Sequence, residues 1–272
     1  MSNEVTVKKS TAVSTEFAGM FDNSLASAGD TLDKADLRIP KLTMIQPLTK
    51  KAFNTEEAAT GNFINSIEKT DLGNSMDIFV MSDTKLWELK YQAGKGSPEY
   101  LGTIDYTRDN EDLKKNPRIP SELLERAKEN NVTLEMLKAG QINMINRFYV
   151  LLVSEVMEGT AFPYIVDFKR SSYPAGLQLK NTFFKMKKTQ GLPSYARAFS
   201  LYSEFIQDEH DYYVKKVSSG RMISEEEIQA VELWVREMMN NRDAYQDDDT
   251  SEEDFVEDTN TIEVQAEDTL KY

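Results

Sequence analysis

Apolar and polar residues alternate with a period of two along several short stretches that turn residues separate. The first stretch carries Leu37, Ile39, Leu42 and Met44 on alternating positions, which predicts a strand. Apolar or β-branched runs with turn signals at their ends predict further strands at residues 61–67, 76–82, 145–156, 162–168, 198–206 and 211–217. Residues 83–120 contain Gly, Pro and Asn among aromatic residues, so we expect a long loop there.

Helical periodicity appears in three places. Residues 121–130 and 133–138 predict two short helices, an insertion at about 121–140 between strands. Residues 176–190 predict a longer helix that ends at Gly191. Ser224 and Glu227 have the spacing of a capping box, and the apolar stripe behind them predicts a C-terminal amphipathic helix.

This order of elements predicts a mainly β protein with helical decorations, in the α+β class. The architecture expected is an OB-fold-like antiparallel barrel plus the C-terminal amphipathic helix, although a β-sandwich or another open barrel also fits the order. We divide the chain into a disordered N-terminal arm (1–33), an OB-fold-like domain (34–242) and a disordered acidic tail (243–272).

Charge is distributed unevenly along the chain. The 272 residues have a formal net charge of −14, but residues 243–272 hold twelve acids and one lysine. Residues 1–242 carry the remaining 34 acids and 31 bases, so the body of the protein is close to neutral. The negative net charge therefore comes mainly from residues 243–272, and nucleic acid remains a candidate ligand for residues 1–242.

The amino-acid composition limits the kinds of catalytic and metal-binding site that the chain can form. The chain has no cysteine, which removes disulfides, thiol nucleophiles and zinc-cysteine sites. His210 is its one histidine, which nearly excludes Ser-His-Asp chemistry and multi-histidine metal sites. We therefore assign no catalytic residue, metal or cofactor. There is no apolar run of membrane-spanning length and no apolar signal segment near Met1, so we expect a cytoplasmic protein that does not contact membranes.

One stretch stands out against the acidic total. Residues 168–203 hold seven cations and no acid, with aromatic residues among them. Cations neutralise phosphates and flat rings stack on unpaired bases, so the pattern favours single-stranded nucleic acid. The predicted phosphate contacts are Lys169, Arg170, Lys180, Lys185, Lys187, Lys188 and Arg197. The predicted stacking rings are Trp87, Tyr91, Tyr100, Tyr106 and Tyr173. A helix and strands with core aromatics and solvated lysines would give the same pattern.

The chain resembles phage-encoded single-stranded DNA-binding proteins of the OB-fold type over about residues 36–240 and the tail. The resemblance is carried by Leu37-Arg-Ile-Pro-Lys-Leu, Gly61-Asn-Phe, Phe162-Pro-Tyr-Ile-Val-Asp-Phe-Lys-Arg-Ser-Ser, Pro193-Ser-Tyr-Ala-Arg-Ala-Phe-Ser-Leu and Asp211-Tyr-Tyr-Val-Lys. It implies sequence-independent protection of single-stranded DNA in replication or recombination, in the host cytoplasm. Many related chains carry a Cys-containing segment after the third strand; this chain has none, so no zinc site is carried over.

The resemblance also implies that the acidic tail recruits replication proteins such as a polymerase, helicase or recombinase. The tail residues expected to contact them are Asp247, Asp248, Asp249, Glu252, Glu253, Asp254, Leu270 and Tyr272.

Two other function classes remain open at this stage. Asp167-Phe-Lys169 matches the D-x-K element of a Mg²⁺-dependent nuclease fold, with Glu155 as the best second carboxylate. Alternatively, the chain is a structural or interaction protein whose sheet packs against copies of itself. A homo-oligomer is compatible with each of these functions.

Overall fold

The structure is a computed structural model, and it describes residues 38–47, 59–208, 211–240 and 246–247. The strands are β1 (Arg38–Ile39), β2 (Leu42–Met44), β3 (Phe63–Asn65), β4 (Ser75–Tyr91), β5 (Glu99–Asp105), β6 (Gln141–Leu152), β7 (Tyr164–Lys169), β8 (Arg197–Ile206), β9 (Tyr212–Val217), β10 (Arg221–Met222) and β11 (Gln246–Asp247). The α-helices are α3 (Leu124–Glu129), α4 (Leu134–Ala139), α5 (Val153–Glu158), α6 (Tyr173–Gln190) and α7 (Glu225–Asn240). Short 3-10 helices are η3 (Arg108–Asn110), η4 (Ser121–Leu123), η5 (Arg170–Ser172) and η6 (Ser194–Ala196). The protein is therefore mixed α+β.

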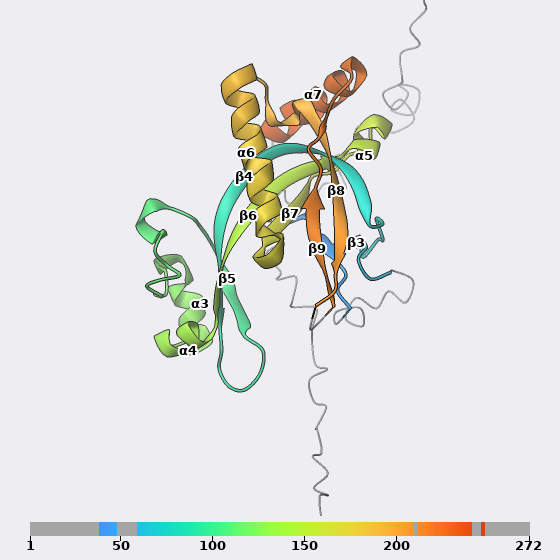
Figure 1. Cartoon of the computed structure of the whole chain (residues 1–272). Coiled ribbons are helices and arrows are strands. Elements are labelled where there is room, and N and C mark those ends of the chain that lie inside the picture. The colour runs from blue at the N-terminus through green and yellow to red at the C-terminus, as the bar shows by residue number, and fades with distance from the viewer. Residues whose placement is uncertain (1–37, 48–58, 209–210, 241–245, 248–272) are drawn as a thin grey trace, which may run out of the picture.

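A seven-stranded antiparallel sheet is built around β4 (Figure 1). Strand β6 pairs with β4 along most of its length, whereas on the other side β8 pairs with the first part of β4 and β5 with the last part. Strand β7 pairs with β6, and β9 and β10 pair with β8. A register shift between Val80 and Ser82 lets the long strand bend, as β-bulges do.

An antiparallel barrel was expected from the sequence, but the strands do not close into one, because β7 and β9 lie at opposite edges of the ladder and do not pair. The N-terminal β2–β3 hairpin lies between these edges. The Ile165 amide of β7 donates to the Pro40 carbonyl at 2.8 Å, and the Gln46 side chain bonds both the amide and the carbonyl of Tyr213 in β9 at 2.9 Å. The hairpin thus connects the two edges of the sheet by a few separate hydrogen bonds and not by a continuous ladder.

The main core lies on the inner face of this curved sheet, where α6 covers it. Phe148 of β6 meets Phe168 of β7 edge-on with ring centroids 5.5 Å apart, and Leu179 and Met186 of α6 pack in the same cluster. Gly176 allows the close approach of the helix, since a Cβ there would lie 2.7 Å from the Cβ of Phe168. Pro174 near its start and Gly191, with φ of 65°, after its end delimit α6.

A second core occupies the lobe formed by the far half of β4 with β5, α3 and α4 (Figure 1). The loop expected over residues 83–120 is wrong in part, because β4 continues to Tyr91 and β5 follows it. The two short helices expected within 121–140 are present, and Thr133 caps α4 by accepting a hydrogen bond from the Met136 amide at 3.2 Å. Trp87, Leu89 and Leu101 are buried in this lobe.

The strand expected over 145–156 instead starts at Gln141 and ends at Leu152, and the chain then turns into α5. A third cluster packs α5 and α7 against the sheet around Phe79, Leu151 and Val231. The C-terminal helix expected from the sequence is confirmed, together with its capping box: Ser224 and Glu227 exchange hydrogen bonds of 2.8 and 3.2 Å. Among the residues described, no helix is both long and apolar enough to cross a bilayer.

The start of α7 yields a pH prediction. Hydrogen bonds from Arg221, at 2.6 and 2.9 Å, lower the pKa of Glu227 to about 2. Because the pKa of Glu227 is lowered in the folded protein, its carboxylate stabilises the fold at pH values above the ordinary glutamate pKa near 4.5. This contribution is lost as the pH falls toward 2. Glu227→Gln is therefore expected to cost about 1–2 kcal/mol at neutral pH, a discounted figure because the Arg221 side chain is half exposed.

Urea unfolding of both proteins would measure this effect, with the exposed neighbour substitution Glu226→Gln as control. The difference between the native protein and Glu227→Gln should shrink near pH 3. A difference that grows on acidification would contradict the assignment.

Candidate nucleic-acid interface

Alternation along β6 and β7 sends their side chains to two opposite faces. Phe148, Val150, Val166 and Phe168 face the main core and α6. The other face, here called the outer face, carries mostly polar or charged side chains: Glu88 and Lys90 of β4, Asn143, Arg147 and Tyr149 of β6, and Asp167 and Lys169 of β7. Lys169 was expected from the sequence as a phosphate contact and Asp167 as part of the D-x-K element. The other five were not singled out, although the period-two pattern of β6 contains the signal.

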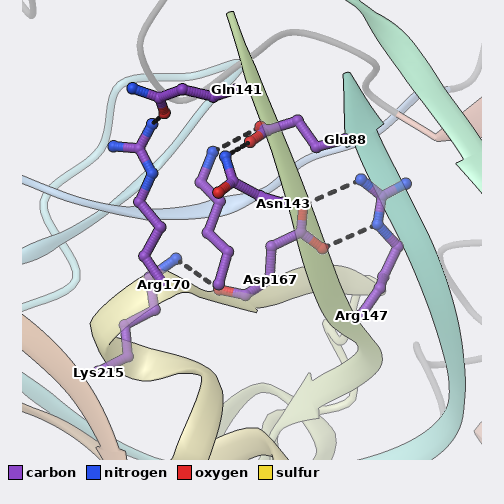
Figure 2. Close-up of polar contacts among 8 residues, drawn as sticks. Glu88, Gln141, Asn143, Arg147, Asp167, Arg170 and Lys215 are labelled. Carbon is purple, nitrogen blue, oxygen red and sulfur yellow. Dashed lines mark hydrogen bonds and ion pairs between the residues drawn. The ribbon is translucent and has the colours of Figure 1, made fainter. Parts of the chain in front are cut away.

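Arg147 and Asp167 form a two-pronged ion pair at the centre of the outer face. Nε and Nη2 of Arg147 donate to the two carboxylate oxygens of Asp167 at 2.8 and 2.9 Å, and both side chains are more than nine-tenths buried (Figure 2). Burial alone would raise the pKa of Asp167, but the charges of Arg147, Lys41 and Lys215 hold that pKa well below its usual value. The carboxylate therefore stays ionised.

A second paired group lies toward the lobe. Lys169 Nζ approaches Glu88 Oε1 at 2.7 Å, and the Asn143 amide donates to the other oxygen of Glu88 at 3.0 Å (Figure 2). Arg170, directly after β7, is exposed, has a φ of 50° and donates to the side chain of Gln141. Lys169 and Arg170, both expected to bind phosphate, thus sit at one end of the outer face.

Positive charge exceeds negative charge in this region. Lys215 of β9 donates from Nζ to the Asp167 carbonyl at 3.2 Å, and Lys41 lies at the bridge to Ile165. Six cations therefore surround the two carboxylates Glu88 and Asp167, namely Lys41, Lys90, Arg147, Lys169, Arg170 and Lys215. Lys41, Lys90, Arg147 and Lys215 are buried, so they can act on an anion only through space, and Lys169 and Arg170 are the two cations nearest the surface.

The remaining expected phosphate contacts do not join this group. Lys180, Lys185, Lys187 and Lys188 are on α6, which covers the opposite face of β6 and β7, and Lys180 pairs with Asp83 at 2.8 Å. Arg197, in β8, donates to the carbonyls of Ser219 and Gly220 at 3.5 and 3.3 Å. The single basic stretch of the sequence is thus divided between two surfaces.

The expected stacking rings also separate. Trp87 and Tyr91 are only 1% and 4% exposed and form part of the lobe core, so a base has no access to them in this fold. The Trp87 indole donates to Asn110 at 3.1 Å, and Tyr91 donates to Glu99 at 2.6 Å. Burial and Glu99 raise the pKa of Tyr91 to about 12. The prediction failed because β5 and the lobe helices, which lie further along the chain, cover both rings.

Three of the expected rings are partly accessible. Tyr106 lies beneath the Lys85 ammonium at 3.7 Å, Tyr100 beneath the Arg126 guanidinium at 5.4 Å, and Tyr173 donates to the sulfur of Met144 at 3.0 Å. The structure adds exposed rings that the sequence did not single out: Tyr202 and Phe205 of β8 are 37% and 48% exposed near the β8–β9 turn. They are three positions apart in β8 and so point to opposite faces of the strand, and the sequence did not show that both are exposed.

The D-x-K element has structural partners. Asp167 holds Arg147, Lys169 holds Glu88, and Glu155 accepts hydrogen bonds from the Tyr164 hydroxyl at 2.8 Å and the Phe162 amide at 3.3 Å. Within the described ranges, no three His, Asp or Glu side chains gather closely enough to hold a metal ion.

The tail residues expected to contact replication proteins lie outside the described residues, with one exception. Asp247 is in β11, whose two residues pair in parallel with Arg38 and Ile39 of β1. The arm expected over residues 1–33 also lies outside the described residues.

No protein-family model matches this chain, and neither a curated protein nor a solved structure does.

Proposed function

We propose that this protein binds single-stranded DNA without sequence preference and protects it during replication or recombination. The observation that carries the proposal is the excess of cations on the outer face of β6 and β7. Neutralising phosphates gives binding that is independent of base sequence, because every nucleotide carries the same charge.

We also propose that the curved sheet belongs to the OB type. Strands β4, β6, β7, β8 and β9 follow one another in the chain, apart from β5, and lie side by side in the order β7-β6-β4-β8-β9. This arrangement fits a partly open five-stranded Greek-key barrel. OB folds bind oligonucleotides on strands two and three and on the loops after strands one and four. Here these correspond to β6 and β7, to the lobe at 92–140, and to the β8–β9 turn.

A DNA strand bound on the outer face would find cations for its phosphates at one end of the face and aromatic rings nearby. Arg170 is the most exposed of the six cations, and Tyr149 of β6 is half buried beside Arg147. Stacking on such rings is tolerant of sequence and adds about 1–3 kcal/mol per base. In this proposal the acidic tail recruits replication proteins, with Leu270 and Tyr272 as its apolar contacts.

Binding should depend strongly on salt. If about four phosphates are neutralised, a fourfold rise in salt should lower the affinity about 50-fold. The measurement is fluorescence anisotropy of a labelled oligo-dT strand, titrated at two salt concentrations beside a labelled duplex. Equal affinity for the duplex, or a flat salt response, would contradict the proposal.

Arg170→Glu is the cleanest single test of the outer face. Reversing an exposed charge that contacts phosphate should weaken strand binding and reduce the salt slope by about one, with little change in stability. Lys169→Glu is less suitable, because it would place a carboxylate against the buried Glu88. Lys187→Glu on α6 makes the same charge change on the opposite side of the sheet and should leave strand binding unchanged.

Removing the tail should strengthen strand binding at low salt. A chain that stops after Asp247 keeps β11 and loses ten acids and one lysine. Less repulsion of phosphate should raise the affinity, and the gain should fade as salt screens the charges. The same anisotropy titration measures this effect; weaker binding after truncation would contradict the proposed repulsion between the tail and the bound strand.

A further inference from the structure

The outward side of α6 exposes apolar groups that the strand-binding proposal does not use. Leu177 and Phe184 are 45% and 67% exposed, and their spacing of seven residues places them on the same side of the helix. An open hollow of about 400 Å³ lies beside Leu177, lined by Pro174, Leu177, Gln178, Asn181, Thr182 and Lys185. A side chain of another segment could enter it.

Positive charge surrounds this apolar strip. Helix α6 contains four lysines and no acid over its 18 residues. Lys180 is paired with Asp83, whereas Lys185, Lys187 and Lys188 are exposed, and the Lys188 ammonium lies 5.4 Å from the centre of the Phe184 ring. Apolar side chains flanked by lysines suit an acidic segment with an apolar centre.

The chain itself contains a segment of that composition. Residues 252–258 read Glu-Glu-Asp-Phe-Val-Glu-Asp, so five acids enclose Phe255 and Val256. Asp247 in β11 is the last described residue before it, and Phe255 lies eight positions further along the chain. Fully extended, eight residues span about 26–29 Å, close to the diameter of a small domain.

We propose that residues 252–258 dock on the outward side of α6 within the same molecule. Phe255 would contact Leu177 and Phe184, and the acids on either side would lie near Lys185, Lys187 and Lys188. Because α6 covers the opposite side of the sheet from the outer face, a strand bound at Arg170 leaves this surface open. The docked segment is then held away from the strand-binding face, and the inference does not depend on strand binding.

The absence of cysteine from the chain makes disulfide trapping a direct test. In Asn181→Cys/Thr259→Cys, one thiol lies beside the hollow and the other directly follows the acidic segment. The control, Lys128→Cys/Thr259→Cys, places the first thiol on α3 in the lobe. If the segment docks, the α6 pair should close within one molecule about tenfold faster than the control, because docking raises the effective concentration of the thiols. The closed form is measured by mass spectrometry.

Adding Phe255→Ala, or raising the salt, should bring the α6 pair down to the control rate. Equal rates in the two pairs would overturn the proposal, as would crosslinks that form only between molecules and depend on protein concentration. Saturating oligo-dT tests whether nucleic acid, and not the tail, occupies the outward side of α6. An unchanged rate of disulfide closure in the α6 pair supports tail docking, whereas a slower rate would assign α6 to nucleic acid. If the protein fails to bind oligo-dT but closes this disulfide rapidly, strand binding is refuted and docking of the tail on α6 still stands.

Discussion

Replacing Asp167 by Asn is expected to destabilise the fold by about 3–5 kcal/mol, because it leaves the Arg147 guanidinium buried without its carboxylate. The Arg147 side chain is 3% exposed, so water cannot solvate the orphaned charge. The loss should persist across the acidic range in which other carboxylates titrate, since the pKa of Asp167 lies far below its usual value. Urea unfolding at several pH values measures it.

The matched control removes both charges together. Arg147→Met/Asp167→Leu should recover most of the stability, since apolar residues of similar volume often replace a buried ion pair without loss. A Mg²⁺-dependent nuclease with Asp167 as metal ligand makes a different prediction: Asp167→Asn would abolish cleavage and leave stability nearly unchanged. A nuclease assay on the native protein and on this variant therefore distinguishes the two roles.

Trp87→Ala is expected to destabilise the lobe by about 3–5 kcal/mol, the usual effect of removing a large aromatic side chain from a core. The indole is 1% exposed, donates a hydrogen bond to Asn110 and lies 5.7 Å from the Tyr106 ring centre. The substitution would leave a cavity among Leu89, Leu101 and their neighbours. Thermal unfolding followed by circular dichroism measures the loss.

Phe184→Ala is the control for Trp87→Ala. Its ring is 67% exposed, so its removal should change stability by no more than about 0.5 kcal/mol. If Trp87 were a stacking residue, Trp87→Ala would instead fold normally and bind oligo-dT more weakly. A normal unfolding midpoint for Trp87→Ala would therefore contradict its burial.

The local sequence was sufficient for the elements whose signals lie within a few residues. The capping box at Ser224, the Thr133 cap and the Gly191 end of α6 were all readable, because each depends on contacts three or four positions apart. The alternation that predicts strands was readable for the same reason. The concentration of acidic residues in the tail was also readable, because it is a property of composition.

Only the tertiary structure decided which face each side chain occupies and what it meets there. Glu88 and Lys169 are 81 residues apart in the chain yet pair at 2.7 Å, because β6 lies between their strands and sets both registers. The same packing buries Trp87 under β5 and the lobe helices, and it places the α6 lysines across the sheet from Arg170. A period of two or 3.6 gives the spacing of side chains on one element, but the neighbour that covers each face depends on strand pairing between distant segments.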